Sequence, residues 1–397
     1  MGRATIEVAD IFRLHGPRYR AQHRLLPHQH RLMRAIERCR TAALGGHVER
    51  CGHCSYKRIR YNSCRNRHCP KCQNLARAKW LERRKAELLP IPYFHVVFTI
   101  PSQLNDLALQ NKKIVYDLMF QTTAAALQCI TGDPKHLGAE VGFFSVLHTW
   151  GQNLSLHPHI HSVVTGGGFN ADRSAWILPR RPDFLVSVRV LGRRFRTLLL
   201  DALMQAFHDG QLAFHASLEH LPDPRQFRRW LSPLSKIEWV VHAKPPFGGP
   251  QQVLEYLGRY THRVAISNQR LLAFDGERVT FQYKDYRRSG QERSQQMTLD
   301  SDEFIRRFLL HALLPGFQRI RHYGILASCQ KRFLLALARD LLGASPHELA
   351  PTRDEIAKVL AAISQPLTIC PKCGVGSMQV IEYLMPDPPL AKHHDTS

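Results

Sequence analysis

Acidic residues and long apolar runs are both scarce in this chain of 397 residues. Its 32 aspartates and glutamates are outnumbered by 55 lysines and arginines, which leaves a formal net charge of +23. A polyanion is therefore the expected partner, and nucleic acid is favoured over an acidic membrane. No apolar run reaches the roughly 18 to 20 residues of a membrane span, and no apolar signal-peptide block opens the chain. We expect a protein that is neither secreted nor inserted in a membrane.

No fixed-period repeat or low-complexity linker interrupts the chain, so its organisation is read from changes in the apolar pattern. Residues 1–90 combine a basic helical lead-in with a cysteine-rich module that has too few apolar residues for a core of its own. Residues 91–265 open with a β-branched and aromatic run at 93–100, which predicts a buried strand. Residues 266–397 combine a hairpin with an Asp-Gly turn, an arginine-rich helical region and a cysteine-containing tail.

The middle region predicts strands and helices without regular β-α-β alternation. Strands are expected near 142–150, 154–165 and 237–243, and helices near 102–130 and 184–231. The strand at 154–165 is expected to end at the glycine run that follows it. This pattern favours an α+β fold over a doubly wound parallel sheet.

Two Cys-x2-Cys pairs in the first region predict one structural zinc site. Cys51 and Cys54 precede Cys69 and Cys72 with 14 residues between the pairs, and four thiolates at such spacing close a tetrahedral Zn²⁺ site. In a chain that is not secreted, this clustering indicates metal binding rather than disulfides.

Further cysteines extend the possible ligand set. Additional candidate zinc ligands are Cys39, Cys64, Cys370 and Cys373, and the last two form half of a site whose other half the sequence does not reveal. The module is also basic, so we expect it to contact DNA through Arg65, Arg67 and Lys71.

Three histidines alternate along the strand predicted at 154–165. His157, His159 and His161 are spaced by two, so all three would project from one face of a strand and could hold a divalent ion. The chain has 23 histidines, which predicts about one His-x-His by chance, but a run of three is much rarer. Metal or phosphate chemistry is therefore favoured here.

Two tyrosines follow on a predicted helix that begins near Gln251. Tyr256 and Tyr260 are four residues apart and share one helix face. A tyrosine hydroxyl is a poor nucleophile unless its target is polarised, so the pair acquires chemical meaning beside a metal site.

Three ordered motifs resemble those of one family: Cys-Arg-Asn-Arg-His-Cys-Pro-Lys-Cys-Gln at 64–73, His-Pro-His-Ile-His at 157–161, and Tyr-Leu-Gly-Arg-Tyr-Thr-His-Arg at 256–263. Together they resemble the two-tyrosine HUH transposases of rolling-circle bacterial insertion sequences, the insertion sequence 91 family. The resemblance covers essentially the whole chain. It implies an antiparallel sheet flanked by helices, with the paired histidines on a central strand opposite the tyrosine helix.

The resemblance also implies a mechanism. His159 and His161 would bind Mg²⁺ or Mn²⁺, and Tyr256 or Tyr260 would attack the scissile phosphate of a single-stranded element end or target, leaving a 5′-phosphotyrosine. The third metal ligand stays open among His157, Gln152 and Glu255. With no G-x-x-x-x-G-K-[ST] loop in the chain, strand separation would depend on a host helicase or on replication.

Three alternatives remain at this stage. A non-enzymatic zinc-ribbon DNA-binding protein accounts for the charge and the cysteines, but leaves the histidines and tyrosines as coincidences. An HUH replication initiator or relaxase shares the catalytic motif, and a DDE-type transposase would need three separated carboxylates, none of which stands out. The expected location is the bacterial cytoplasm, in association with the nucleoid.

Overall fold

The computed structural model describes residues 6–85, 87–244, 252–253, 258, 264–286, 288, 290–327, 329–344, 354, 357–359, 361 and 369–387. The chain forms two compact units, and each is assembled from segments far apart in the sequence. The first comprises Met1–Lys79, His262–Ala312 and Ala357–Ser397, and the second Trp80–Thr261 and Leu313–Ile356. This differs from the predicted division into 1–90, 91–265 and 266–397, because strands from the last region pair with strands of both earlier ones.

An antiparallel sheet forms the centre of the second unit, as the α+β prediction requires. Its strands follow the order β11-β4-β5-β3-β7. They are β3 (Tyr93–Thr99), β4 (Glu140–Trp150), β5 (Leu156–Phe169), β7 (Val241–Lys244) and β11 (Ile320–Gly324), and the short β6 (Trp176–Ile177) pairs with β5. Strand β11 lies in the region where the sequence predicted only helix.

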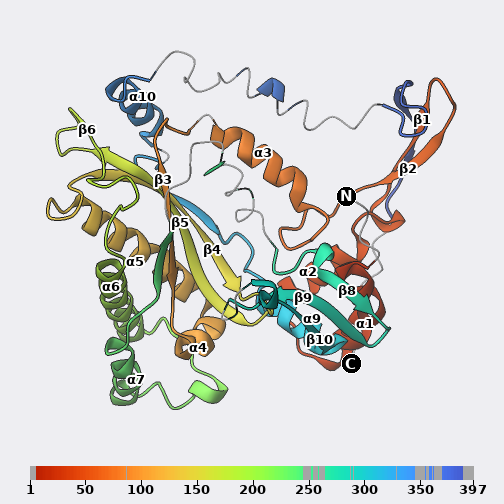
Figure 1. Cartoon of the computed structure of the whole chain (residues 1–397). Helices are drawn as coiled ribbons and strands as arrows, with labels where there is room; N and C mark the ends of the chain where they lie inside the picture. Colours follow the sequence, from red (N-terminus) through yellow and green to blue (C-terminus); the bar gives the residue numbers. More distant parts are fainter. Residues whose placement is uncertain are drawn as a thin grey trace. The chain divides into compact units, whose positions relative to one another are not determined.

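Helices cover the sheet on both faces. They are α4 (Asn105–Gln110), α5 (Lys112–Gly132), α6 (Val188–His208), α7 (Pro224–Leu231) and α10 (Lys331–Leu341), with 3₁₀ turns η2 (Ser102–Leu104), η3 (Ala216–Leu218) and η4 (Ser232–Ser235). Figure 1 shows α5 and α6 side by side along one face, where they pack on Phe98 and Ile160 of the sheet. The other face packs on α10 through Phe144, Val146 and Val163.

Strand β5 continues through the glycine run, so the turn predicted there is wrong. Gly167 adopts a φ of +124°, and a Cβ atom on it would lie 2.4 Å from the Ile177 carbonyl oxygen. A Cβ atom on Gly168 would lie 2.2 Å from the carbonyl oxygen of Glu140 on β4. These glycines allow neighbouring backbones to approach closely inside the sheet instead of ending it.

The first unit combines helices with two small sheets. Its helices are α1 (Val8–Gln22), α2 (Pro27–Arg38) and α9 (Ser301–Leu310), with 3₁₀ turns η1 (Ala42–Leu44), η5 (Asn268–Arg270) and η6 (Gly290–Arg293). One sheet contains β8 (Leu271–Phe274), β9 (Arg278–Lys284) and β10 (Ser294–Asp300), which extends the predicted hairpin by one strand. The rings of Phe12 and Phe308 pack edge to face at 5.2 Å and join α1 to α9.

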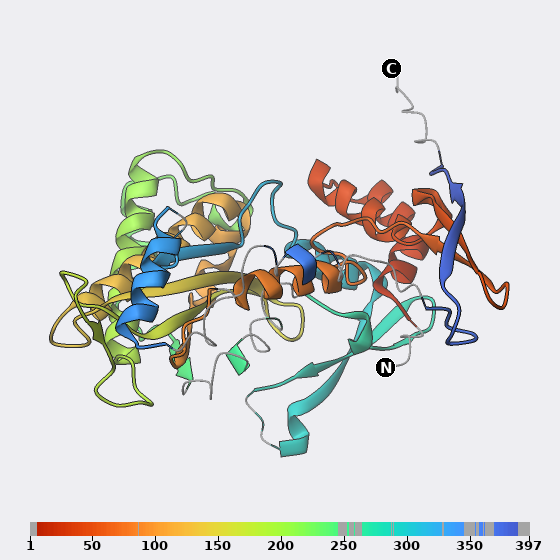
Figure 2. The same cartoon turned by 90° about the horizontal axis from the view of Figure 1, so that it is seen from above.

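The second sheet of this unit brings the two ends of the chain together. It has the order β12-β1-β2, with β1 (Gly46–Cys51), β2 (Lys57–Tyr61) and β12 (Met378–Leu384). Figure 2 shows β12, in blue, beside the orange β1–β2 hairpin. Helix α3 (Gln73–Lys85) continues from the cysteine-rich segment into the second unit. No helix within the described residues has both the length and the apolar character to cross a membrane.

Ile160 tests the core of the second unit, because it is fully buried between two sheet histidines and packs among the residues beneath α5 and α6. We expect Ile160→Ala to lower the free energy of unfolding by about 2 to 5 kcal/mol, and the control Ile160→Val by only about 0.5 to 1.5 kcal/mol. Urea unfolding followed by tryptophan fluorescence reports this unit, since it holds all five tryptophans, Trp80, Trp150, Trp176, Trp230 and Trp239. Equal losses for both variants would contradict the packing described.

Candidate active site and metal centres

Three histidine side chains meet on one face of the central sheet. His159 and His161 alternate along β5, and His148 of β4 is the cross-strand partner of His159. Each offers a ring nitrogen, and these nitrogens all lie within 4.8 Å of one another. His148 is 2% exposed and His161 9%, so the cluster is largely shielded from solvent. The sequence places His148 in a predicted strand but contains no sign of the register that brings it opposite His159.

His157, one of the three candidates for the third ligand, is not a member of this cluster. Among the residues that the structure describes, the cluster joins His148 to the β5 pair, and His157 is exposed. The pairing of β4 with β5 shifts register between His148 and Trp150, so that Trp150 pairs with Leu156, and the β4 residue between them is a threonine, Thr149. The third nitrogen therefore comes from the neighbouring strand rather than from the same strand.

A hydrogen bond fixes the tautomer of His159. Its Nδ1 lies 2.6 Å from the carbonyl oxygen of His157, and a carbonyl only accepts, so Nδ1 carries the proton. The lone pair of a neutral His159 is then on Nε2. Metal-binding histidines commonly donate their other N–H in this way. Three imidazole nitrogens suit a transition metal ion better than Mg²⁺, which prefers oxygen ligands.

A fourth histidine supports the cluster from β3. His95 is 1% exposed, and its Nε2 lies 2.9 Å from Nδ1 of His161. The two rings are nearly parallel, at 12°. Burial, together with the positive charge of Lys244, lowers the pKa of His95 to about 3, so its ring is neutral at physiological pH. A neutral His95 can accept the Nδ1 proton of His161 and leave Nε2 of His161 for a metal. His95 was not among the site residues predicted from the sequence.

The same face of the sheet carries the start of the tyrosine segment. Gln252 and Val253 are helical, and the fully buried Val253 packs in the apolar cluster that contains Val146 and Val163. These two valines alternate with the sheet histidines on the same strands, so Val253 lies over the histidine face. Tyr256 and Tyr260, like Glu255, lie outside the described residues.

A first group of four thiols lies in the first unit. Cys39, Cys64, Cys69 and Cys72 have all their sulfur atoms within 4.8 Å of one another. The Sγ of Cys72 is 3.3 Å from that of Cys39 and 3.5 Å from that of Cys64. Four thiolates placed tetrahedrally at about 2.3 Å from Zn²⁺ would be about 3.8 Å apart, so this group fits the ion after a small expansion.

A second group joins Cys51 and Cys54 to Cys370 and Cys373. The structure thus corrects the predicted grouping, because Cys51 and Cys54 do not share a cluster with Cys69 and Cys72. The reason is the antiparallel pairing of β1 with β12, which aligns Cys51 with Met378. The cysteines first regarded as surplus, Cys39 and Cys64 in one group and the tail pair in the other, complete the two sets of four.

The three basic residues predicted to contact DNA differ in how exposed their side chains are to solvent. Arg65 is exposed and Arg67 half-buried. Lys71 forms an ion pair with Glu7, and its side chain is 8% exposed. The predicted DNA contact of Lys71 is therefore not supported, because its ammonium group already neutralises a carboxylate.

A basic groove of about 510 Å³ lies on the second unit. Its charged lining comes from α7 and the turn after it, namely Arg225, Arg228, Arg229 and Lys236. The described residues that line it include no acid. Phosphate groups of a nucleic-acid backbone are the natural ligand for such a surface.

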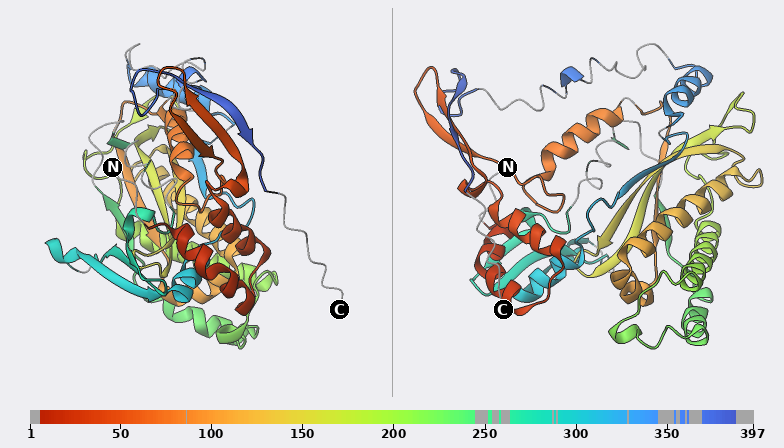
Figure 3. Two further views of the ribbon diagram at one scale, coloured as in Figure 1. Left: turned by 90° about the vertical axis from the view of Figure 1, so that its right-hand side faces the viewer. Right: turned by 180° about the vertical axis from the view of Figure 1, so that it is seen from behind.

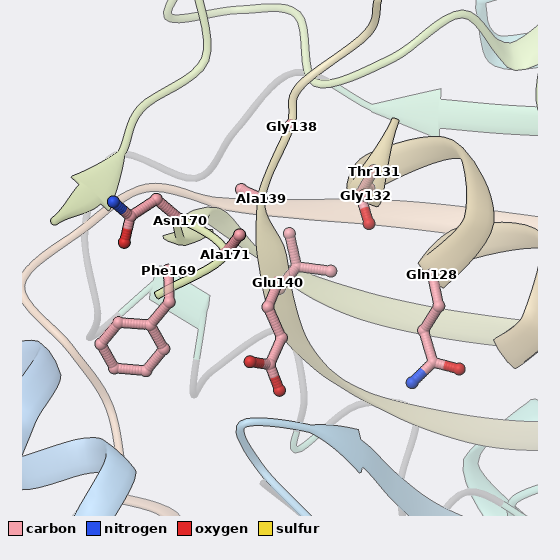
Figure 4. A pocket seen from close by; sticks show the side chains of 10 residues that line it. Gln128, Thr131, Gly132, Gly138, Ala139, Glu140, Phe169, Asn170 and Ala171 are labelled. Atoms are coloured by element: carbon pink, nitrogen blue, oxygen red, sulfur yellow. The ribbon is translucent and has the colours of Figure 1, made fainter. Parts of the chain in front are cut away.

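A separate pocket of about 290 Å³ lies where β4 begins and β5 ends. Figure 4 shows Glu140 between Gln128 and Phe169 in its lining. The Glu140 carboxylate accepts hydrogen bonds from Arg173, at 3.0 Å from Nε. The pocket is at the opposite end of these strands from the histidines, and it is not part of the candidate active site.

Two family models match the regions of the chain that carry the first thiol group and the histidine cluster. Residues 11–100 match the family model described as "Transposase zinc-binding domain", and residues 142–332 match the one described as "Putative transposase". The first contains the complete first thiol group, and the second contains His148, His159 and His161. No solved structure matches the chain.

Two relatives extend the similarity over most of the chain. "Putative transposase y4qJ" of Sinorhizobium fredii (strain NBRC 101917 / NGR234) is 55% identical over 386 residues, which is 96% of each chain. "Transposase for insertion sequence element IS801" of Pseudomonas savastanoi pv. phaseolicola is 31% identical over 294 residues, 73% of this chain and 68% of that protein. The resemblance found in the sequence is confirmed, and the chain belongs to the zinc-binding transposases of the insertion sequence 91 family.

Proposed function

We propose that this transposase cuts single-stranded DNA at the ends of its insertion sequence through a tyrosine nucleophile and rejoins the strands in rolling-circle transposition. The observation that carries the proposal is the cluster of His148, His159 and His161. His95 contacts His161 of this cluster through their ring nitrogens. The cluster lies on the same face of the sheet as the valines against which Val253 packs. DNA binding alone does not require three histidine ring nitrogens that are close together and shielded from solvent.

The three histidines would hold a divalent ion, with Mn²⁺ or Mg²⁺ as the candidates. When bound, the ion polarises the scissile phosphate and stabilises its developing charge. His159 contributes Nε2 because its Nδ1 proton is held by the His157 carbonyl. His161 contributes Nε2 because its Nδ1 faces His95. The protein thereby fixes the ring orientations before any ion arrives.

A helix that continued from Val253 would direct the tyrosines to the same site. Residues three and seven positions after Val253 share its side of a continuous helix, and these are Tyr256 and Tyr260. In the proposed step a tyrosine oxygen loses its proton and bonds to phosphorus. The bond to the 3′ oxygen breaks, and this oxygen takes up a proton. The 5′-phosphotyrosine conserves the bond energy, so a 3′-OH can reverse the step and join strands without ATP.

The thiol groups and the basic residues would have structural and DNA-binding roles. We assign the structural Zn²⁺ of the zinc-binding domain to Cys39, Cys64, Cys69 and Cys72. Arg65 and the basic groove on α7 would contact phosphates without reading sequence. A host helicase or replication would supply single strands, which places the protein at the nucleoid in the bacterial cytoplasm. A replication initiator or relaxase would share the chemistry, but both matched relatives are named as transposases.

The metal assignment predicts a pattern across four alanine variants. His148→Ala, His159→Ala and His161→Ala should each reduce cleavage of labelled single-stranded element ends at least about 100-fold, because each removes a metal ligand. His157→Ala is the matched control and should cleave normally. DNA affinity should stay within about twofold for all four, because it depends on basic residues elsewhere. Normal cleavage by His148→Ala together with loss in His157→Ala would restore the ligand set predicted from the sequence.

The supporting role of His95 is tested by metal affinity. His95→Phe keeps a ring of similar size but removes the acceptor for His161, so Mn²⁺ should bind about 10 to 100 times more weakly. His95→Gln retains an acceptor oxygen and should recover much of the loss. Titration of Mn²⁺ followed by electron paramagnetic resonance measures binding without any reaction. If His95→Phe bound Mn²⁺ like the unmodified protein, His95 would be only a packing residue.

Tyrosine-to-phenylalanine changes test the nucleophiles, because they remove the hydroxyl and keep the ring. The double variant Tyr256→Phe/Tyr260→Phe should bind DNA and form no covalent adduct. At least one single variant should still cut a donor end, yet both should fail in complete transposition if two covalent ends must coexist. A single variant that transposes normally would show that one tyrosine suffices.

A further inference from the structure

The two ends of the chain meet at the second thiol group. Cys51 ends β1 and Cys54 lies in the turn after it, whereas Cys370 and Cys373 directly precede β12. The antiparallel pairing of β12 with β1 brings the two Cys-x2-Cys turns together. Figure 3 shows β12 alongside the hairpin from two further directions.

The sulfur geometry fits a tetrahedral ion and excludes disulfides. The Sγ atoms of Cys51 and Cys373 are 3.8 Å apart, and those of Cys54 and Cys370 are 3.6 Å apart. A disulfide bond would need about 2.05 Å, while two ligands of a tetrahedral Zn²⁺ at about 2.3 Å lie about 3.8 Å apart. Cys51 is 1% exposed and Cys370 is fully buried.

Both turns direct backbone amides at the sulfur atoms. The amides of His53 and Cys54 donate to Sγ of Cys51, each at 3.4 Å. On the tail, Lys372 N–H donates to Sγ of Cys370 and Gly376 N–H to Sγ of Cys373, also at 3.4 Å. Amide donors of this kind stabilise thiolates, the form that binds a metal. Each turn therefore has the arrangement of one half of a zinc ribbon.

Glycine allows the tail to approach the first turn. A Cβ atom at Gly376 would lie 2.4 Å from Sγ of Cys51 and 2.6 Å from Cβ of His53. Gly376 also accepts a hydrogen bond from the Cys370 amide at 2.7 Å, and Ser377 accepts one from Gly52 at 3.0 Å. The backbone of the tail at Gly376 and Ser377 therefore lies directly against the turn that contains Gly52 and His53.

We propose that Cys51, Cys54, Cys370 and Cys373 bind a second structural zinc ion, which fastens the C-terminal tail to the N-terminal module. Each thiol releases its proton to solvent as its sulfur binds the ion. The apolar cluster here has few members, mainly Cys51, Cys370 and Met378, so the ion must supply much of the free energy that keeps β12 in place. The tail pair lies outside both matched family models, which end at residues 100 and 332. This site does not depend on the proposed nuclease chemistry.

Zinc stoichiometry of the full chain tests the proposal. Protein purified without chelator should hold two equivalents of zinc by elemental analysis. Cys370→Ser/Cys373→Ser should hold one, and Cys64→Ser/Cys69→Ser should also hold one. The matched control Cys129→Ser/Cys329→Ser changes two exposed cysteines outside both groups and should keep two. One equivalent in the unmodified chain, unchanged by the tail substitutions, would overturn the second site.

Limited trypsin digestion gives an independent readout if the Cys64→Ser/Cys69→Ser variant does not fold. Lys372 lies between the tail cysteines, and its side chain is exposed. With the ion bound, the turn should resist cleavage after Lys372, and Cys370→Ser/Cys373→Ser should be cut there at least about ten times faster. Adding a zinc chelator should produce the same acceleration in the unmodified chain. Equal cleavage rates for all forms would show that no ion holds the tail.

Discussion

The register between β4 and β5 is the constraint on which the candidate active site depends. It places His148 opposite His159, and a slip of one residue would turn a whole strand's side chains to the other face. Ile160 fixes the direction, because it is buried beneath α5 and α6 and forces its two histidine neighbours to the opposite face. Packing on one face of the sheet therefore orients the histidine side chains on the other face. His95 and Val253 lie on the same face as these histidines.

The first unit depends on a different constraint in its cysteine-rich part. The segment around 46–72 has few buried apolar residues, and sulfur ligands take the place of a core. The two groups of four are built differently: one uses residues within a short stretch of the chain, and the other joins residues more than 300 positions apart. The region of this chain that matches the zinc-binding domain thus contains six cysteines, two of which lie beside cysteines of the tail.

Local sequence patterns predicted where the main strands of the central sheet lie. They did not predict which residues strand pairing brings together at the histidine cluster and the two thiol groups. Runs of β-branched, aromatic and other apolar residues located β3, β4 and β5, and the spacing of His159 and His161 identified the strand that carries two of the clustered histidines. The third nitrogen, from His148, and the support from His95 depend on strand register, which a single sequence does not contain. The same holds for Cys51 and Cys54, whose true neighbours follow β11 and α10 in the chain. Lys71 was expected at DNA from its charge alone, but its partner Glu7 comes from the start of α1.

The proposed function requires that a tyrosine beside the three-histidine face becomes joined to DNA. Peptide mapping by mass spectrometry, after incubation with single-stranded element ends and Mn²⁺, identifies the joined residue directly. We expect a nucleotide linked through its 5′ phosphate to the peptide that contains Tyr256 and Tyr260. Cut DNA without any linked peptide, or a nucleotide attached to another residue, would contradict it.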